Sequence, residues 1–272
     1  MLGSELLNIL SLSSQHQIIG VDQYDFDICS KKDVYEILAE IKPDIIIHCA
    51  AYTNVDKAEE EQEKCLSINF EGTKNLAEYC KEHDIVLCYI STDFVFDGEN
   101  KKPYIETDKA NPINYYGYSK YKAEEWIIKN IKKYFILRIS WLYGPNGKNF
   151  VQTIINFAKE KKQIDVVDDQ IGCPTYTKDF AKNILPVITS DKYGIYHMPG
   201  SGICSWFVFA KKIMEIKNLD VKVVPISSDK LNRLAKRPKN SVLNSDKLYD
   251  NFGIRMRPWE EALEDYLGAD GL

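Results

Sequence analysis

The sequence predicts an α/β protein in which helices cover both faces of a parallel, doubly wound sheet. Short runs rich in isoleucine and valine alternate with longer stretches of helical periodicity through the first half of the chain. Strands that are apolar on both sides are typical of parallel sheets buried between helices, and the strand–helix–strand succession is typical of doubly wound folds. A chain of 272 residues, 44% of them hydrophobic, is long enough for one such domain and a smaller lobe.

The predicted elements follow one another in a regular order before residue 143 and less regularly after it. We expect strands at residues 17–21, 44–49, 85–90, 134–139, 164–167 and 195–197. We expect helices at residues 31–41, 60–82, 116–131, 148–162 and 177–188. From about residue 200 prolines interrupt shorter elements. We therefore assign residues 1–147 and 176–199 to the main domain, and residues 148–175 and 200–268 to a smaller, partly discontinuous substrate lobe.

The composition excludes several classes of protein. A net charge of −5 does not suit a duplex nucleic-acid binder, which normally has a basic face. No run of about 18 apolar residues and no basic-then-apolar leader pattern are present. The seven cysteines include no Cys-x-x-Cys pair, which argues against a disulfide framework or a zinc site. We expect a cytoplasmic protein with reduced thiols that binds neither nucleic acid nor membrane.

The N-terminal segment resembles the end of a nucleotide-binding loop. A dinucleotide-binding domain of the Rossmann type opens with a strand and a glycine-rich turn, whose backbone N–H groups face the pyrophosphate. This chain opens with Met1-Leu2-Gly3 and a helical pattern, so Gly3 corresponds to the last glycine of such a turn. We expect the first strand and the earlier glycines to belong to a longer native chain. Asp22 follows at about the distance where an acidic side chain binds the ribose, which favours NADH over NADPH, although both stay open.

Three side chains carry the candidate chemistry, namely Thr92, Tyr116 and Lys120. Tyr116 and Lys120 are four positions apart in a predicted helix, so their side chains share one face. The pKa of a free tyrosine is about 10, and a nearby ammonium lowers it. We therefore expect Tyr116 to act as a general acid beside Lys120. Thr92 ends a predicted strand, where ligands bind in open parallel sheets, and is placed to hold a substrate oxygen.

The same spacing occurs a second time, at Tyr118 and Lys122. Two residues turn a helix by about 200°, so the two pairs cannot address one site. The context favours Tyr116, which follows Asn111-Pro112 and directly precedes Gly117.

Five segments along the chain resemble, in order and spacing, the dTDP-4-dehydrorhamnose reductases, a group of extended short-chain dehydrogenases/reductases. The segments are HCAAYTNVDKAE at residues 48–59, STDFVFDG at 91–98, RISWLYG at 138–144, VDDQIGCPT at 167–175 and RPKNS at 237–241. The resemblance covers nearly the whole chain.

The resemblance implies a role for each candidate residue. Tyr116 would protonate the sugar C4 oxygen while NADPH or NADH delivers hydride to C4, Lys120 would hold the nicotinamide ribose, and Thr92 would orient the keto group. The other residues implied at the cofactor are Gly3, Asp22, Asp27, Ile28, Ala50, Ala51 and Tyr52. Those implied at the substrate, besides Thr92, are Val55, Asp56, Trp141, Asn149 and Arg237. Arginine suits a diphosphate because its planar fork makes bidentate hydrogen bonds.

Other features of the resemblance are weaker. Glu5 matches a glutamate that takes part in magnesium-linked dimer contacts in some relatives. A homodimer and Mg²⁺ therefore stay open, although the sequence itself does not support Mg²⁺. His48 lies within an apolar run and is expected to be a core histidine.

Three functions remain open at this level. The first is reduction of dTDP-4-dehydro-L-rhamnose to dTDP-L-rhamnose, or of a close stereoisomer, in nucleotide-sugar and cell-surface polysaccharide biosynthesis. The second is a non-catalytic regulatory subunit on the same scaffold, like the similar subunit that partners methionine adenosyltransferase. The third is another nucleotide-sugar reductase, an epimerase or a dehydratase, although the segments at 167–175 and 237–241 fit the reductases better.

Overall fold

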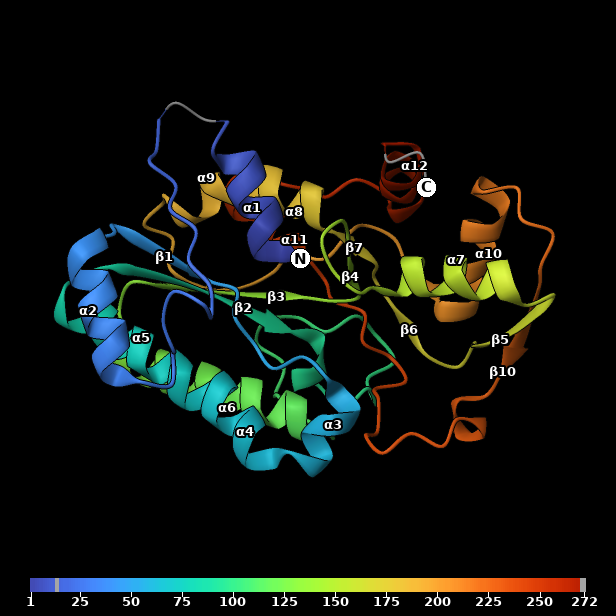
Figure 1. The fold of residues 1–272 in the computed structure, drawn as a ribbon, viewed down its shortest axis with the longest axis horizontal. Coiled ribbons are helices and arrows are strands. Elements are labelled where there is room, and N and C mark those ends of the chain that lie inside the picture. The colour runs from blue at the N-terminus through green and yellow to red at the C-terminus, as the bar shows by residue number, and fades with distance from the viewer. Residues whose placement is uncertain (13–14, 270–272) are drawn as a thin grey trace.

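A parallel sheet of four strands forms the centre of the computed structural model, which describes residues 1–12 and 15–269 (Figure 1). The strand order is β1-β2-β3-β8, and every neighbouring pair is parallel. The bounds are β1 (Ile45–His48), β2 (Val86–Thr92), β3 (Tyr134–Ile139) and β8 (Gly194–His197). The predicted α/β class with a doubly wound parallel sheet is confirmed.

Helices lie on both sides of this sheet (Figure 1). One side carries α1 (Leu2–Leu10), α8 (Thr177–Asn183), α9 (Leu185–Ile188) and α11 (Asp246–Phe252). The other side carries α2 (Lys31–Ile41), α3 (Val55–Glu60), α4 (Gln62–Leu66), the π-helix η1 (Ser67–Gly72), α5 (Thr73–Glu82) and α6 (Tyr115–Asn130).

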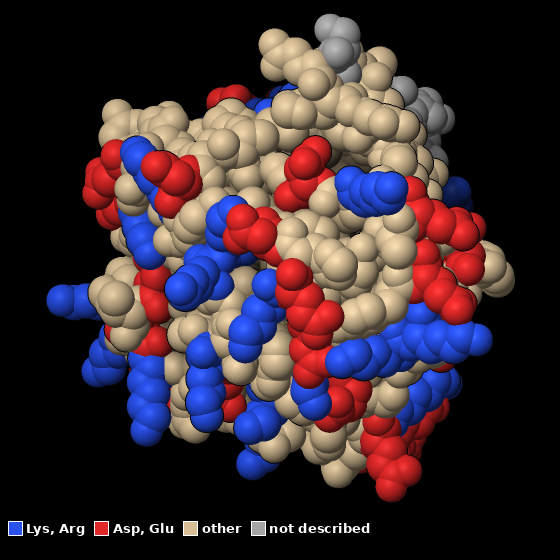
Figure 2. All heavy atoms as spheres, turned by 90° about the vertical axis from the view of Figure 1, so that its left-hand side faces the viewer, with Lys and Arg blue, Asp and Glu red and all other residues tan. Residues whose placement is uncertain are grey.

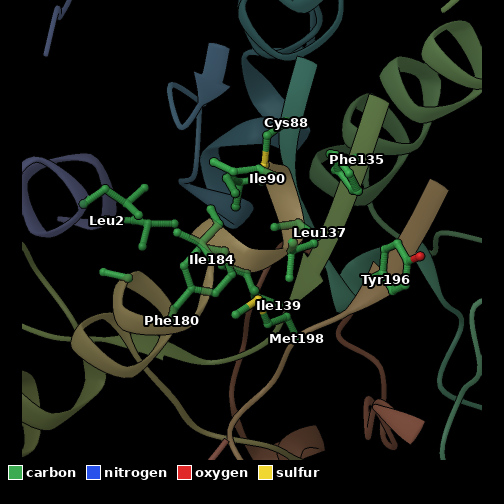
Figure 3. Packing of buried hydrophobic residues seen from close by; sticks show 14 of the residues in the cluster. Leu2, Cys88, Ile90, Phe135, Leu137, Ile139, Phe180, Ile184, Tyr196 and Met198 are labelled. Atoms are coloured by element: carbon green, nitrogen blue, oxygen red, sulfur yellow. The ribbon is translucent and has the colours of Figure 1, made fainter. Parts of the chain in front are cut away.

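The alternation of side chains along β2 explains why both faces are covered. Cys88 and Ile90 point into a core shared with Leu2 of α1 (Figure 3). Leu87 and Tyr89 belong to a second core, formed with α2, α5 and α6. Because successive strand residues face opposite sides, an unbroken apolar run supplies both cores at once.

A second group of elements packs beyond the carboxyl end of this sheet around its own core. Its helices are α7 (Phe150–Glu160), α10 (Trp206–Ile216) and α12 (Trp259–Ala269). Its paired strands are β5 (Gln163–Val167) with β10 (Lys222–Ile226), β4 (Leu142–Tyr143) with β7 (Thr175–Tyr176), and β6 (Ile171–Gly172) with β9 (Cys204–Ser205). Two 3₁₀ turns, η2 (Asp93–Val95) and η3 (Ser228–Lys230), complete the fold.

Three of the strands and helices predicted from the sequence differ from those in the structure. Residues 17–21 form no strand, because this apolar segment pairs with no other strand among the described residues. The helix predicted at 60–82 is divided: Glu61, with φ −103° and ψ 46°, separates α3 from α4, and η1 separates α4 from α5. The helix predicted at 177–188 is two helices, because Pro186 has no N–H with which to continue the ladder of α8.

The surface is of mixed charge. Lys and Arg are interspersed with Asp and Glu on the side of the molecule that lies to the left in Figure 1, as Figure 2 shows. Within residues 1–12 and 15–269, no helix has the length and apolarity required to span a bilayer. All seven cysteines are free thiols.

Candidate active site

Thr92 lies at the carboxyl end of β2, where the chain turns into η2. Its hydroxyl accepts a hydrogen bond from the Phe94 N–H at 3.2 Å and donates to the neighbouring Asp93 carboxylate at 3.1 Å. Both Thr92 and Asp93 are buried. Burial raises the pKa of Asp93 to about 6, although hydrogen bonds from Ser241 and Thr92 oppose the increase.

The start of α6 is fixed directly beside this turn. Asn114 caps the helix by accepting from the Gly117 N–H at 2.8 Å, and its own amide donates to the Lys236 carbonyl at 2.8 Å. A Cβ at Gly117 would lie 2.1 Å from the Phe94 carbonyl oxygen. Only glycine therefore allows the first turn of α6 to approach η2 this closely.

This approach brings Tyr116 next to Thr92. The Tyr116 ring packs edge-on against Phe94 at 5.7 Å, and its hydroxyl hydrogen-bonds with Thr92. Burial raises the pKa of Tyr116 well above the ordinary tyrosine value, and the nearby Asp93 carboxylate adds to this, while the Thr92 hydrogen bond acts in the opposite direction. The expectation that an ammonium lowers this pKa is wrong for the net effect, because burial dominates.

Lys120 lies one turn farther along α6 and is buried beneath the end of the sheet. Its ammonium donates to the Ile90 carbonyl at 2.8 Å and lies 4.0 Å from the centre of the Tyr89 ring. Burial lowers the pKa of Lys120 to about 7, and the Glu124 carboxylate partly opposes the decrease. Burial therefore favours the neutral form of both side chains, so the Tyr116 phenol keeps its proton at neutral pH and the Lys120 ammonium loses its proton more easily than a free lysine.

The second tyrosine–lysine pair lies elsewhere. The Tyr118 side chain is 41% exposed, and its ring packs against that of Tyr115 at 5.6 Å. Lys122 pairs with Glu125 at 3.2 Å on the surface of the same helix.

A cavity of about 390 Å³ begins at Phe94 and extends between η2 and the second group of elements. Trp141, Arg237 and Ser241 are among its lining residues. Arg237 forms an ion pair with Asp56 at 2.7 Å, so two residues implied at the substrate contact each other. The Arg237 guanidinium holds the pKa of the Asp56 carboxyl below its ordinary value.

Two other residues implied at the substrate, Asn149 and Val55, lie at the starts of helices. Asn149 is buried and caps α7, accepting from the Gln152 N–H at 3.0 Å and donating to the Gly144 carbonyl at 2.8 Å. Val55 is the first residue of α3 and is partly buried.

Small residues lie at the carboxyl end of β1, beside the start of α1. A Cβ at Gly3 would lie 3.7 Å from the Cys49 Cβ, and the following Ala50 is exposed. Ala51 and Tyr52 are partly buried. This combination of small side chains and a helix N-terminus fits the diphosphate of a dinucleotide.

The remaining residues implied at the cofactor lie in the segment between α1 and α2. Asp22 is exposed and accepts from the Tyr24 N–H at 2.8 Å. Asp27 accepts from the Cys29 N–H at 2.9 Å. The Ile28 carbonyl accepts from the Asn75 amide at 3.0 Å, which places it against α5. Asp22 and Asp27 thus make local turn contacts, whereas Ile28 contacts α5. Thr92, Tyr116 and Lys120 lie together at the carboxyl end of β2 and the start of α6.

Two residues next to the site could not be found from the sequence. Asn69, fully buried in η1, donates to the Tyr52 carbonyl at 3.1 Å and accepts from the Tyr52 N–H at 2.7 Å. Trp206 stacks on Trp141 with ring centres 3.5 Å apart. Both contacts join distant parts of the chain, and no local pattern signals either. The Asn114-x-x-Gly117 spacing is typical of a helix cap and was a usable signal.

His48 is a core histidine, as expected. It is 4% exposed and its Nε2 lies 3.0 Å from the Thr73 hydroxyl. Burial lowers the pKa of His48 to about 3, so the ring is neutral. Glu5 is also buried, and in the described part of the chain no group of three or more His, Cys, Asp and Glu side chains is arranged to hold a metal ion.

Comparison with known proteins places these features in a family. The family model described as the RmlD substrate binding domain matches residues 1–270. The chain is 37% identical over 277 residues to a dTDP-4-dehydrorhamnose reductase of Aggregatibacter actinomycetemcomitans, covering 97% of this chain and 94% of that protein. It is 38% identical over 266 residues to a spore coat polysaccharide biosynthesis protein of Bacillus subtilis, covering 98% of this chain and 93% of that protein.

Solved structures agree with the sequence relatives. The crystal structure of dTDP-4-dehydrorhamnose reductase from Bacillus anthracis in complex with NADP is 42% identical, with a TM-score of 0.95 over 98% of this chain and 95% of that one. A UDP-glucose 4-epimerase of Thermotoga maritima, 19% identical with a TM-score of 0.82, shares the fold alone. The chain belongs to the RmlD substrate binding domain family.

Proposed function

We propose that this chain is a cytoplasmic NAD(P)H-dependent reductase that converts the C4 keto group of dTDP-4-dehydro-L-rhamnose to the alcohol of dTDP-L-rhamnose. The observation that carries the proposal is the juxtaposition of Thr92, Tyr116 and Lys120 at the end of β2, next to the cavity. Membership of the family and the names of its reductase members support the substrate class. Neither the regulatory-subunit nor the epimerase reading has a specific observation in its favour.

In the proposed reaction Tyr116 is the general acid. Because burial raises its pKa, the phenol keeps its proton at neutral pH and donates it to the C4 oxygen as charge develops there. The Thr92 hydroxyl donates a second hydrogen bond to the same oxygen and so orients the keto group. Lys120, with a pKa lowered to about 7, exchanges protons readily near neutrality and is suited to restore the phenol proton after turnover.

The cofactor residues are part of the same proposal. A bound NADPH or NADH would supply the hydride for C4. Gly3, Ala50, Ala51 and Tyr52 would hold it at the end of β1, and Lys120 would contact its ribose. We extend the proposal to Asp22, Asp27 and Ile28 for the adenosine half, and to Val55, Asp56, Trp141, Asn149 and Arg237 for the nucleotide sugar.

The domain division remains a proposal as well. Residues 1–147 and 176–199 would bind the cofactor, and residues 148–175 and 200–268 would enclose the nucleotide sugar.

The test is a reductase assay of the purified chain with dTDP-4-dehydro-L-rhamnose, following the loss of NADPH or NADH absorbance. We expect turnover by the wild type, and a kcat lower by about 10²–10⁴-fold for Tyr116→Phe, the range general acid–base catalysis contributes. Tyr118→Phe is the matched control, and its kcat should stay near that of the wild type.

Two results would overturn the proposal. Loss of activity in Tyr118→Phe with retention in Tyr116→Phe would reverse the assignment of the acid. Absence of turnover by the wild type, with product-bound protein still detectable by calorimetry, would favour the non-catalytic subunit.

A further inference from the structure

Trp141 has an unusual backbone conformation at the wall of the cavity. It follows β3 with a φ of +48°, a left-handed conformation that costs a non-glycine residue free energy. Its carbonyl accepts from the Thr175 N–H at 3.2 Å, which fixes the peptide group. Trp141 is one of the residues that line the cavity.

Trp206 covers one face of this indole. The two ring centres lie 3.5 Å apart, and the ring planes differ by 6°. Phe150 packs in turn against Trp206, with ring centres at 4.4 Å. All three aromatic side chains line the cavity.

Gly172 covers the other face. A Cβ at Gly172 would lie 2.5 Å from Cε2, 2.6 Å from Nε1 and 2.9 Å from Cζ2 of Trp141. All three atoms belong to Trp141 and none to Trp206, although the Trp206 ring lies only 3.5 Å from that indole. Gly172 therefore lies across the indole from Trp206, and any larger residue there would displace it.

The residues that cover the two faces of the Trp141 indole, Gly172 and Trp206, are both held by one short two-stranded ribbon. In β6 and β9, Gly172 pairs with Cys204 and Ile171 pairs with Ser205. Trp206 directly follows Ser205, whose hydroxyl caps α10 by accepting from the Val208 N–H at 3.1 Å. The ribbon therefore fixes the separation between Gly172 and Trp206, and with it the slot that the Trp141 indole fills.

We propose that Trp206 and Gly172 are positioning residues that hold the Trp141 indole as a rigid wall of the nucleotide-sugar site. The substrate class in this statement rests on the proposed function. A side chain that is already immobilised loses little conformational entropy when the ligand binds, so the arrangement strengthens binding of the sugar nucleotide. Because the wall contacts ground state and transition state alike, it contributes to KM more than to kcat.

The first test is independent of activity. The chain has four tryptophans, so protein labelled with 5-fluorotryptophan should give one fluorine resonance for each, and Trp141→Phe identifies that of Trp141. We expect Trp206→Leu and Gly172→Ala each to shift and broaden the Trp141 resonance. Trp259→Phe is the matched control, because Trp259 belongs to the same core and does not line the cavity. An unchanged Trp141 resonance in Trp206→Leu, or an equal change in Trp259→Phe, would overturn the inference.

The second test is kinetic. Trp206→Leu should raise the KM for dTDP-4-dehydro-L-rhamnose roughly tenfold, the effect of losing one close aromatic pair, with little change in kcat or in the KM for NADPH. Trp206→Phe, which keeps an aromatic face, should recover most of the affinity. A fall in kcat at constant KM, or no recovery by phenylalanine, would show that Trp206 acts otherwise. If the wild type does not reduce this substrate, the proposed function fails, and the fluorine spectra alone decide the positioning role.

Discussion

The buried ion pair of Arg138 and Glu124 is the polar contact near the site whose disruption is expected to cost the most stability. Arg138 of β3 donates to the two carboxylate oxygens of Glu124 on α6 at 3.0 and 2.6 Å, and the side chains are 3% and 0% exposed. His197 lies 3.3 Å from the guanidinium, and burial together with the Arg138 charge lowers its pKa to about 3, so the ring is neutral and adds no second positive charge. Glu124→Gln therefore leaves a buried cation without the carboxylate that faces it.

The cost follows from this burial. Removing one partner of a buried pair destabilises a protein by about 3–5 kcal/mol. At roughly 2–4 °C per kcal/mol for a chain of this size, Tm should fall by about 6–20 °C. Urea unfolding and a thermal scan at neutral pH both measure the effect.

A surface pair of similar length provides the control. Lys133 and Asp84 lie 2.5 Å apart, with side chains 38% and 80% exposed. Asp84→Asn should cost less than about 1 kcal/mol, since exposed pairs contribute little. Asparagine also tolerates the left-handed backbone at this position, where φ is +59°. If the two variants lose similar stability, burial is not what makes the Arg138–Glu124 pair important, and the reasoning is refuted.

Three further predictions concern the site and its supports. Gly117→Ala should lower stability by about 1–3 kcal/mol and reduce kcat, because the new methyl group would push α6 away from the Phe94 carbonyl; urea unfolding and the reductase assay measure both. Burial lowers the pKa of Lys120 from 10.5 to about 7, so between these two pH values the unfolded chain binds more protons than the folded chain. The free energy of unfolding of the wild type should therefore rise with pH in this window, relative to that of Lys120→Met. Thermal scans of both proteins at several pH values between 7 and 10.5 test the sign. Asn149→Ala should cost about 0.5–2 kcal/mol through loss of the α7 cap, and a rise in the KM for the nucleotide sugar beyond this would support the substrate role proposed for it.

The periodic elements of the fold were predictable because their signals are local. The strand predicted at 134–139 is β3, with the same bounds, and the helix predicted at 31–41 is α2. The cap of α2 is also local, since the Ser30 hydroxyl accepts from the Asp33 N–H at 3.3 Å. The segment at 17–21 has the same apolar character as β3, but a strand also requires a neighbour, and apolar periodicity does not specify one.

The site was predictable only in part, because some of its contacts follow from local spacing and others join residues far apart in the sequence. The i and i+4 relation of Tyr116 and Lys120 follows from the helix alone. The ion pair between Asp56 and Arg237 joins residues 181 positions apart, and the sequence offered both only as separate substrate residues. The cavity wall likewise depends on Trp206, which reaches Trp141 only through the pairing of β6 with β9.

The pKa values of Tyr116 and Lys120 differ most from what the sequence predicts. From spacing alone, the lysine was expected to lower the pKa of the tyrosine, whereas burial raises the pKa of Tyr116 and lowers that of Lys120 to about 7. Glu124 opposes the second change, and its position depends on the bidentate contact with Arg138. The ion pair that stabilises the fold therefore also keeps Lys120 chargeable at neutral pH. Loss of the Glu124 carboxylate should therefore move the limb of the kcat–pH profile that reports Lys120 toward lower pH, whereas a purely structural role would reduce kcat equally at every pH.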